Sequence, residues 1–258
     1  MENLVILSTD FLIFLLVVLI AIFAVYASKK EHLRAPWRHV VRSRVGVATM
    51  VILSFYVVIG LLDSVHFHPE LPAEEQTEKV RYSTEIISLF DQLVGPLRTE
   101  HERTYSAPLS AYLYSKESME LADGTTVRDF PRLKYGGAHL TNPEQEWLPD
   151  IWRRSVLGAL KGVVVSVVAI NIVLMFIGFA RGKHFGRVAK EVLLGQPEIP
   201  WRVLLGTLTV MLVLLFWTME LASAYHLFGT DKVGEDVFYQ ALKSIRTGLL
   251  IGTLTTLV

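Results

Sequence analysis

The chain of 258 residues contains no cysteine. Its folded regions therefore hold no disulfide, no thiolate metal site and no cysteine nucleophile, and they depend on packing alone. It also lacks the Gly-x-x-x-x-Gly-Lys-Ser/Thr loop with which many proteins bind nucleotide phosphates, so ATP-driven work would need another subunit. Its 25 basic and 25 acidic residues cancel, which gives no indication of nucleic-acid binding.

What the chain has in abundance is apolar sequence, which makes up 52% of its positions. Each of its long apolar runs is close to the roughly 20 residues that cross a bilayer core as a helix. There are four such runs: Leu4–Ala27, Val45–Leu62, Ser155–Ala180 and Val203–Ala224. A fifth, from Ile245 to Val258, is shorter than a full span. We therefore predict a mostly α-helical membrane protein with four full transmembrane helices and the start of a fifth, and expect a larger protein to continue past Val258.

The distribution of charge predicts an orientation in the membrane. Residues 28–44 and 181–202 are short connections rich in Lys and Arg, and such loops stay in the cytoplasm. Residues 63–154 hold more acidic than basic side chains. The N-terminus and residues 63–154 are therefore predicted to be extracytoplasmic. Glu2 stands where a signal peptide would carry basic residues, which indicates that the first apolar run is an uncleaved anchor.

The ends of the apolar runs divide the chain into four predicted parts. Residues 1–62 hold two transmembrane helices and a basic cytoplasmic loop, 63–154 form an extracytoplasmic insert, 155–224 form a transmembrane hairpin, and 225–258 hold a Gly-Thr-Asp segment, an interfacial helix and the start of the next span. Within the insert, Glu74–Val94 has one apolar face, which is typical of a helix. Ala122–Thr125 is a turn signal between two short strands. We expect the insert to be a small α+β domain.

Charged residues inside the apolar runs are candidates for pairing, because a charge in the bilayer is costly. Asp10 and Lys161 lie at similar predicted depths in the first and third helices. We hypothesise that they form an intramembrane ion pair; the alternative is that each reaches the outer headgroups by itself. His66 and His68 have a spacing that can share a metal ion in an extended strand, but no cysteine supports them, and a solvated loop is the favoured interpretation.

The most informative segment runs from His226 to Leu249. Gly229-Thr230-Asp231 can turn the chain as it leaves the bilayer, and Asp231 or Asp236 could cap the helix that follows. From Val237 onward the apolar positions share one helical face, which is typical of an interfacial helix that leads into a span. The segment is therefore either a simple elbow or a gating element, and neither interpretation makes it catalytic.

This segment resembles permease subunits of dipeptide and oligopeptide ABC importers. These subunits carry a stretch like H-x-L-G-T-D-x-x-G-R-D-V-x-x-R-x-x-x-G-x-R-x-S-L just before a membrane helix. The positions in register here are His226, Gly229, Thr230, Asp231, Gly234, Asp236, Val237, Arg246 and Leu249. The chain departs from the pattern at Glu235, Gln240, Ser244 and Gly248. Residues 34–44 are similar to the basic N-terminal segment of the same family.

The resemblance implies the N-terminal portion of a divergent, enlarged permease subunit in a bacterial inner membrane, which imports peptides or similar small solutes. It implies a second permease subunit, cytoplasmic ATPase subunits and an extracytoplasmic solute-binding protein as partners. ATP and Mg²⁺ would bind those ATPase subunits, so no cofactor and no enzymatic activity are expected in this chain. The E-A-A-x-x-x-G loop that couples the family to its ATPase would lie beyond Val258. The motif or gating residues would be Gly229, Thr230, Asp231, Gly234, Asp236 and Arg246.

Two other classes of protein stay open. One is a membrane scaffold or assembly protein that presents residues 63–154 to partners. The other is a sensor whose extracytoplasmic region binds a ligand. A sensor needs a cytoplasmic output domain, and neither predicted cytoplasmic loop is long enough to form one.

Overall fold

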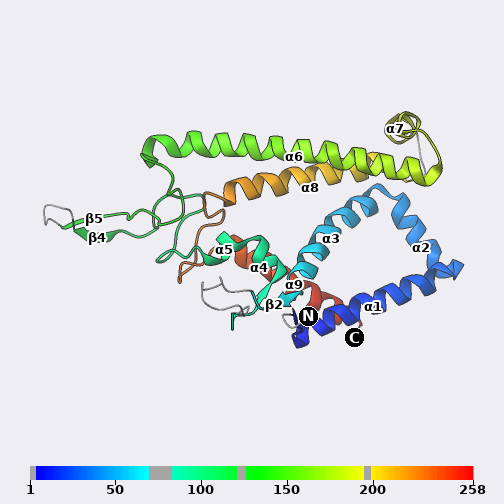
Figure 1. Cartoon of the computed structure of the whole chain (residues 1–258), viewed down its shortest axis with the longest axis horizontal. Coiled ribbons are helices and arrows are strands. Elements are labelled where there is room, and N and C mark those ends of the chain that lie inside the picture. The colour runs from blue at the N-terminus through cyan, green and yellow to red at the C-terminus, as the bar shows by residue number, and fades with distance from the viewer. Residues whose placement is uncertain (1–3, 70–82, 121–125, 195–198, 258) are drawn as a thin grey trace, which may run out of the picture. The chain divides into compact units, whose positions relative to one another are not determined.

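The computed structural model describes residues 4–69, 83–120, 126–194 and 199–257, and helices dominate it (Figure 1). Within these ranges the helices are α1 (Ser8–Ser28), α2 (Glu31–Arg42), α3 (Arg44–Leu62), α4 (Leu89–Leu93), α5 (Gly95–Thr99), α6 (Pro143–Arg181), α7 (Phe185–Leu194), α8 (Trp201–Ala222) and α9 (Val237–Leu257). The strands are β1 (Leu4–Val5), β2 (His66–Phe67), β3 (Ile87–Ser88), β4 (Glu117–Glu120) and β5 (Thr126–Asp129).

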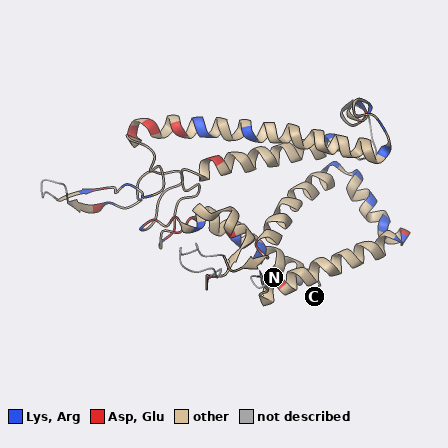
Figure 2. Ribbon diagram, in the orientation of Figure 1, with Lys and Arg blue, Asp and Glu red and all other residues tan. Residues whose placement is uncertain are grey.

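Four helices, α1, α3, α6 and α8, are long and apolar enough to cross a membrane. They coincide with the four predicted apolar runs and confirm a mostly helical protein with four candidate spans. In Figure 2, the ribbon segments coloured as charged residues lie mostly towards the ends of these helices, and long uncharged stretches lie between them. α9 continues without a break through the expected junction between an interfacial helix and a fifth span.

The third of these helices begins earlier than the hydropathy of the sequence indicates. α6 starts at Pro143, in a stretch that we had assigned to the insert. Proline suits the first turn of a helix, where its missing N–H has no partner to lose. Glu144 and Glu146 add negative charge near the positive end of the helix dipole. Residues 143–154 are therefore the polar first part of a helix that continues into a candidate span.

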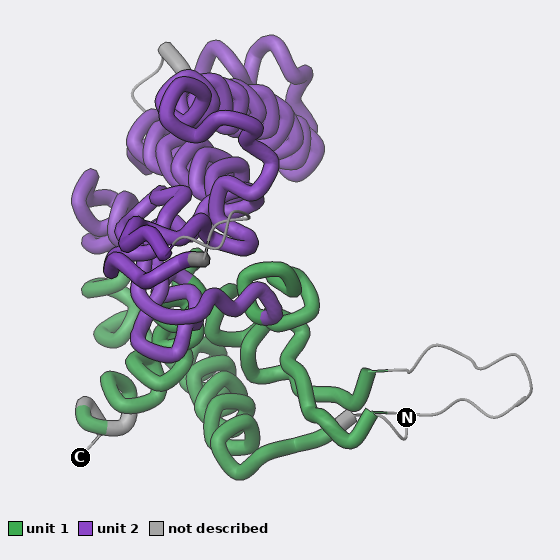
Figure 3. The backbone as a smooth tube through the Cα atoms, turned by 90° about the vertical axis from the view of Figure 1, so that its left-hand side faces the viewer, with its two compact units in different colours: residues 1–37, 53–98, 239–258 green, residues 38–52, 99–238 purple. Residues whose placement is uncertain are grey.

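The chain divides into two compact units, coloured separately in Figure 3. One comprises residues 1–37, 53–98 and 239–258, and the other residues 38–52 and 99–238. The predicted insert is thus shared between the two units instead of forming one domain. The predicted C-terminal part is also divided, because residues 225–238 join the second unit and residues 239–258 the first.

In the first unit, a small antiparallel sheet joins the beginning of α1 to the end of α3. β2 is its central strand, and Val5 is opposite His66 while Phe67 is opposite Ile87. The predicted helix over Glu74–Val94 is confirmed only for Leu89–Leu93, which forms α4, and is wrong at Ile87–Ser88, which is a strand. The Ser88 side chain accepts a hydrogen bond from the Asp91 N–H and so begins α4. Residues 74–82 of that prediction lie outside the described ranges.

In the second unit, α6 and α8 run side by side (Figure 1) and meet through small residues. A Cβ added at Gly158 would lie 2.8 Å from the Trp217 Cα atom, and one at Gly162 would lie 2.6 Å from the Val213 Cα atom. Ser166, four residues further on, is buried in the same row. This spacing of small residues lets two helix backbones approach closely in a membrane. The sequence shows this row as Gly-x-x-x-Gly-x-x-x-Ser, a pattern typical of closely packed membrane helices.

At the other end of this helix pair, α7 packs its apolar face onto them. Val188 and Val192 of α7 are buried in a cluster with Leu174, Ile177 and Leu205. Elsewhere in the same unit, β4 and β5 pair in antiparallel register, which confirms the predicted hairpin. Its predicted turn, residues 122–125, lies outside the described ranges.

We expect Gly162→Leu to destabilise the second unit by at least about 1–3 kcal/mol, because the new side chain must displace the backbone of α8. The measurement is SDS-induced unfolding of the purified protein in mixed micelles. Gly206→Leu is the matched control, since a Cβ at Gly206 in α8 meets no atom within 4 Å. Equal losses in the two variants would contradict the close approach of α6 and α8.

Candidate functional site

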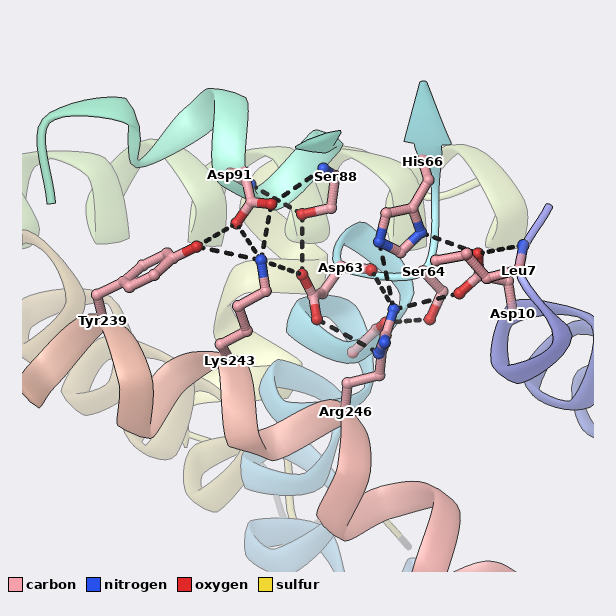
Figure 4. A network of polar contacts seen from close by, with 11 residues as sticks. Leu7, Asp10, Asp63, Ser64, His66, Ser88, Asp91, Tyr239, Lys243 and Arg246 are labelled. Carbon is pink, nitrogen blue, oxygen red and sulfur yellow. Dashed lines mark hydrogen bonds and ion pairs between the residues drawn. The ribbon is translucent and has the colours of Figure 1, made fainter. Parts of the chain in front are cut away.

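The first unit contains a buried polar network that we call the Arg246 cluster (Figure 4). Five separate elements supply its side chains: the first turn of α1, the residue after α3, strand β2, the start of α4 and one face of α9. The three contributions of α9 recur at intervals of four and three residues, which places them on one face of the helix. The members are Asp10, Asp63, His66, Ser88, Asp91, Tyr239, Lys243 and Arg246.

Arg246 connects the ends of α1 and α3. Its Nη1 atom donates to Asp10 Oδ1 at 3.2 Å and to the Asp63 main-chain carbonyl at 3.0 Å. Asp10 has no exposed surface, and its Oδ2 atom accepts a hydrogen bond from the Leu7 N–H at 3.0 Å and lies 2.8 Å from His66 Nδ1. A buried carboxylate needs such compensation, because losing its hydration is costly. The guanidinium of Arg246 and the imidazole of His66 therefore offset the free-energy cost of burying the Asp10 carboxylate.

These contacts correct the hypothesis of an Asp10–Lys161 pair, because each side chain has a different partner. Asp10 pairs with His66 and Arg246, whereas Lys161 Nζ lies 2.6 Å from Glu220 Oε2, across the contact between α6 and α8. The same contacts correct the interpretation of His66 as part of a solvated loop, since this imidazole is buried.

Lys243 and Asp91 form the second half of the Arg246 cluster. Lys243 Nζ lies 2.7 Å from both carboxylate oxygens of Asp91, and the Tyr239 hydroxyl donates to one of them at 2.7 Å. Burial alone would raise the pKa of Asp91, but the hydrogen bonds from Lys243, Tyr239 and the Ser88 N–H lower it to about 2. Asp91 is therefore ionised throughout the neutral range.

Asp63 is the least compensated carboxylate of the cluster. Ser88 donates to its Oδ1 atom at 2.8 Å. Its Oδ2 atom is buried without a hydrogen bond in the described structure, and the Arg246 Nε atom lies 3.4 Å away. Burial raises the pKa of Asp63 above its ordinary value, against the lowering effect of Ser88, Lys243 and Arg246.

A second network, the His226 cluster, lies in the other unit and consists of Glu102, His226 and Asp236. His226 follows α8, and all three side chains are buried. The imidazole Nδ1 lies 2.7 Å from Asp236 Oδ2, and its Nε2 lies 3.4 Å from Glu102 Oε1. Glu102 also accepts hydrogen bonds from the main-chain N–H groups of Lys134, Tyr135 and Gly136. The network thus joins the Gly-Thr-Asp segment to two distant stretches of chain.

The carboxylates on both sides of His226 keep its ring charged. Burial alone would lower the pKa of His226, but hydrogen bonds to Asp236 and Glu102 raise it to about 9. The pKa of Glu102 is held at about 2, because hydrogen bonds from His226 and three main-chain N–H groups outweigh its burial. At neutral pH the cluster is an imidazolium between two carboxylates. These ion pairs hold Glu102, His226 and Asp236 together.

The two glycines of the Gly-Thr-Asp segment are required by close approach to residues 102–106. Gly229 and Gly234 have φ angles of 75° and 81°, a region that favours glycine. A Cβ at Gly229 would lie 2.2 Å from the Ser106 carbonyl oxygen, and one at Gly234 would lie 1.9 Å from the Glu102 carbonyl oxygen. Neither backbone could stay in place with a side chain present.

Polar side chains complete the same turn. The Thr230 hydroxyl donates to the Thr104 carbonyl at 2.7 Å, and the Thr230 N–H donates to the Ser106 hydroxyl at 3.1 Å. Asp231 Oδ1 accepts from the N–H groups of Val233 and Glu235, so its carboxylate closes the turn ahead of α9.

The structure therefore separates the predicted motif residues into two groups. Gly229, Thr230, Asp231, Gly234 and Asp236 form one turn that is held by residues 102–106, whereas Arg246 belongs to the cluster of the first unit. Sequence reasoning missed the partners Glu102, Ser106, Asp91 and Lys243. No local spacing could have found them, since Glu102 is 124 residues from His226.

Both clusters are closed sets of ion pairs and hydrogen bonds between side chains and main chain. Within the described ranges, no group of three or more His, Asp and Glu residues is placed to hold a metal ion. The arrangement can fix the ends of α1, α3, α8 and α9.

The fold and its candidate spans define a class, that of helical membrane proteins with several transmembrane helices. No family model, curated protein or solved structure matches the chain.

We expect His226 to give the second unit a pH-dependent stability. A group whose pKa rises from 6.5 to about 9 on folding adds about 3 kcal/mol below pH 6.5, and this contribution is lost as the pH rises through 9. His226→Gln, which cannot be charged, should remove this dependence. SDS-induced unfolding between pH 6 and pH 10 would measure it. The same pH slope in both proteins would show that the pKa of His226 does not change on folding.

Proposed function

We propose that the chain is the N-terminal portion of a transmembrane permease subunit of an ATP-driven ABC importer for peptides or similar small solutes. The observation that supports this proposal most directly is the way the Gly-Thr-Asp segment is built. Its two glycines occupy positions that no other residue could fill, and its polar side chains are the ones that close the turn. The residues that resemble the permease motif are therefore those on which this local structure depends.

The departures from the motif fit the same structure. Gln240 and Ser244 lie on α9, and Ser244 is exposed. Glu235 offers its main-chain N–H and carbonyl to Asp231, so the turn uses its backbone. Gly248 lies in open space, where a Cβ would meet no atom within 4 Å. The turn and the Arg246 cluster can thus be kept although these four residues differ.

In this proposal the N-terminus faces the extracytoplasmic side of a bacterial inner membrane. Residues 63–142, which link α3 to α6, face the same side. A solute-binding protein would deliver the substrate there. A second permease subunit would complete the pathway, and cytoplasmic ATPase subunits would bind ATP and Mg²⁺. The Gly-Thr-Asp segment, held by the His226 cluster, would set where α9 enters the membrane, and it would act as a gating or bracing element.

The test is purification of the native protein from its own membranes in mild detergent, followed by mass spectrometry of the subunits that copurify. We expect a second permease and an ATPase with a phosphate-binding loop, and an ATPase activity that rises when a peptide-loaded binding protein is added. Purification without an ATPase partner would overturn the proposal and favour the scaffold or the sensor.

A further inference from the structure

The helix between the first two spans has two distinct faces. Along α2 the apolar side chains follow each other at intervals of three and four residues and share one side of the helix. They are Leu33, Pro36, Trp37, Val40 and Val41. The opposite side carries Glu31, Arg34, Arg38, His39 and Arg42. α2 is therefore an amphipathic helix whose polar face is cationic.

The apolar face of α2 is uncovered, in contrast to that of α7. Both are short amphipathic helices that connect two spans. α7 buries Val188 and Val192 completely against its own unit. No residue of α2 is buried in the described structure, and its Trp37 side chain is 54% exposed. A face of this kind requires a partner that the packing of the chain does not supply.

The position of α2 in the chain places a lipid surface within reach. α1 ends at Ser28 and α2 begins at Glu31; α2 ends at Arg42 and α3 begins at Arg44. With links this short, both ends of a helix about 18 Å long must stay at the bilayer surface. In Figure 2, several segments of the α2 ribbon carry the colour of basic residues. Lys29, Lys30 and Arg44 at its ends add to the positive charge.

We propose that α2 lies in the plane of the membrane surface and binds anionic phospholipids. Its apolar face enters the boundary between headgroups and acyl chains, and its arginines contact the headgroup phosphates. Pro36 fits this position, because it lacks the N–H that would satisfy a carbonyl of the preceding turn, and an interface that contains water can hydrate that carbonyl. This inference requires only that α1 and α3 span a membrane, and it does not depend on the transport function.

The absence of cysteine makes a direct test possible. Single cysteines would replace Val40, on the apolar side of α2, and the adjacent His39, on its polar side. Each cysteine would carry a spin label in the full chain. The labelled chain would be reconstituted into phosphatidylcholine vesicles with or without phosphatidylglycerol. We expect the label at position 40 to collide mainly with oxygen and the label at position 39 with a water-soluble nickel complex. This difference should increase with phosphatidylglycerol. A label at Leu19, an exposed position in α1, is the control for a site inside the bilayer.

A second experiment tests the charge. A triple variant changes Arg34, Arg38 and Arg42 to glutamine. We expect it to retain several-fold less phosphatidylglycerol than the unchanged protein, as measured by native mass spectrometry. Arg181, Arg187 and Lys190, changed in the same way near α7, are the matched control and should leave lipid retention unchanged.

Several results would overturn the proposal. A label at position 40 shielded from both reagents would mean that protein covers this face, as a second copy or a different subunit would. Equal accessibility at positions 39 and 40 would mean that the helix does not lie at the interface. Equal lipid loss in both triple variants would mean that retention follows total charge and is not a property of α2.

Discussion

Arg246→Ala should reduce the stability of the first unit by about 3–5 kcal/mol, the cost of removing one member of a buried ion pair. Arg246 is the only arginine of the Arg246 cluster in the described structure. Its guanidinium contacts Asp10 and two oxygens of Asp63. Without it, these buried carboxylates depend on His66 and on Lys243, whose Nζ atom is 3.9 Å from Asp63. SDS-induced unfolding in mixed micelles measures the loss. Arg187→Ala, at an exposed position of α7, should change the stability by no more than about 0.5 kcal/mol.

A double variant shows whether the loss comes from uncompensated charge. Asp10→Asn alone should destabilise the protein, because it weakens the contacts to His66 and Arg246. In the Arg246→Ala background, however, Asp10→Asn should recover part of the stability, since it removes a buried charge that has lost its partner. If the two losses simply add, Asp10 and Arg246 do not interact in the folded protein.

Gly234→Ala should be among the most damaging single changes in the second unit, with a cost above about 4 kcal/mol or a failure to accumulate in the membrane. The new Cβ would lie 1.9 Å from the Glu102 carbonyl oxygen, at a φ angle of 81°. The turn would have to open, and Asp236 would move away from His226. Protein yield and SDS-induced unfolding are the measurements.

Two other glycines separate the causes of this effect. Gly182 has a φ angle of 61° but open space around it, so Gly182→Ala should cost only the about 1–2 kcal/mol of a left-handed backbone. Gly206 lies within α8 with open space, and alanine there should be neutral or stabilising by up to about 1 kcal/mol. A loss at Gly234 no larger than that at Gly182 would refute the close approach to Glu102.

The spans could be predicted from the sequence because a membrane imposes a length and a composition that are read directly. Each of the four apolar runs coincides with a long helix over most of its length, although the first run begins in β1 and the fourth ends two residues after α8. Where polarity and helix formation coincide, the sequence is ambiguous: Pro143 to Arg154 reads as part of a soluble insert, although it is the first part of α6. The opposite error occurred at Ile87 and Ser88, where an apolar periodicity suggested a helix and the chain forms a strand.

The candidate site could be predicted only where its signal is local. The glycines and aspartates of the Gly-Thr-Asp segment stand close together, and their turn chemistry is recognisable. The partners Glu102 and Ser106 come from a stretch that carries no motif. Their role depends on tertiary contacts between segments that are far apart in the sequence. A charge inside an apolar run is a reason to expect a partner for Asp10, but the sequence alone cannot distinguish Lys161 from Arg246 as that partner.

The long separation between partners has a consequence for the order in which this protein is made. Asp10 is synthesised before its arginine, which is 236 residues further along the chain. Residues 102–106 likewise emerge long before Thr230, with which they pair. Until Arg246 has been synthesised, the first unit lacks the arginine that connects Asp10 to Asp63. At that stage the side chain left to compensate Asp10 in the described structure is His66, and binding of an insertase or chaperone would protect the incomplete unit most.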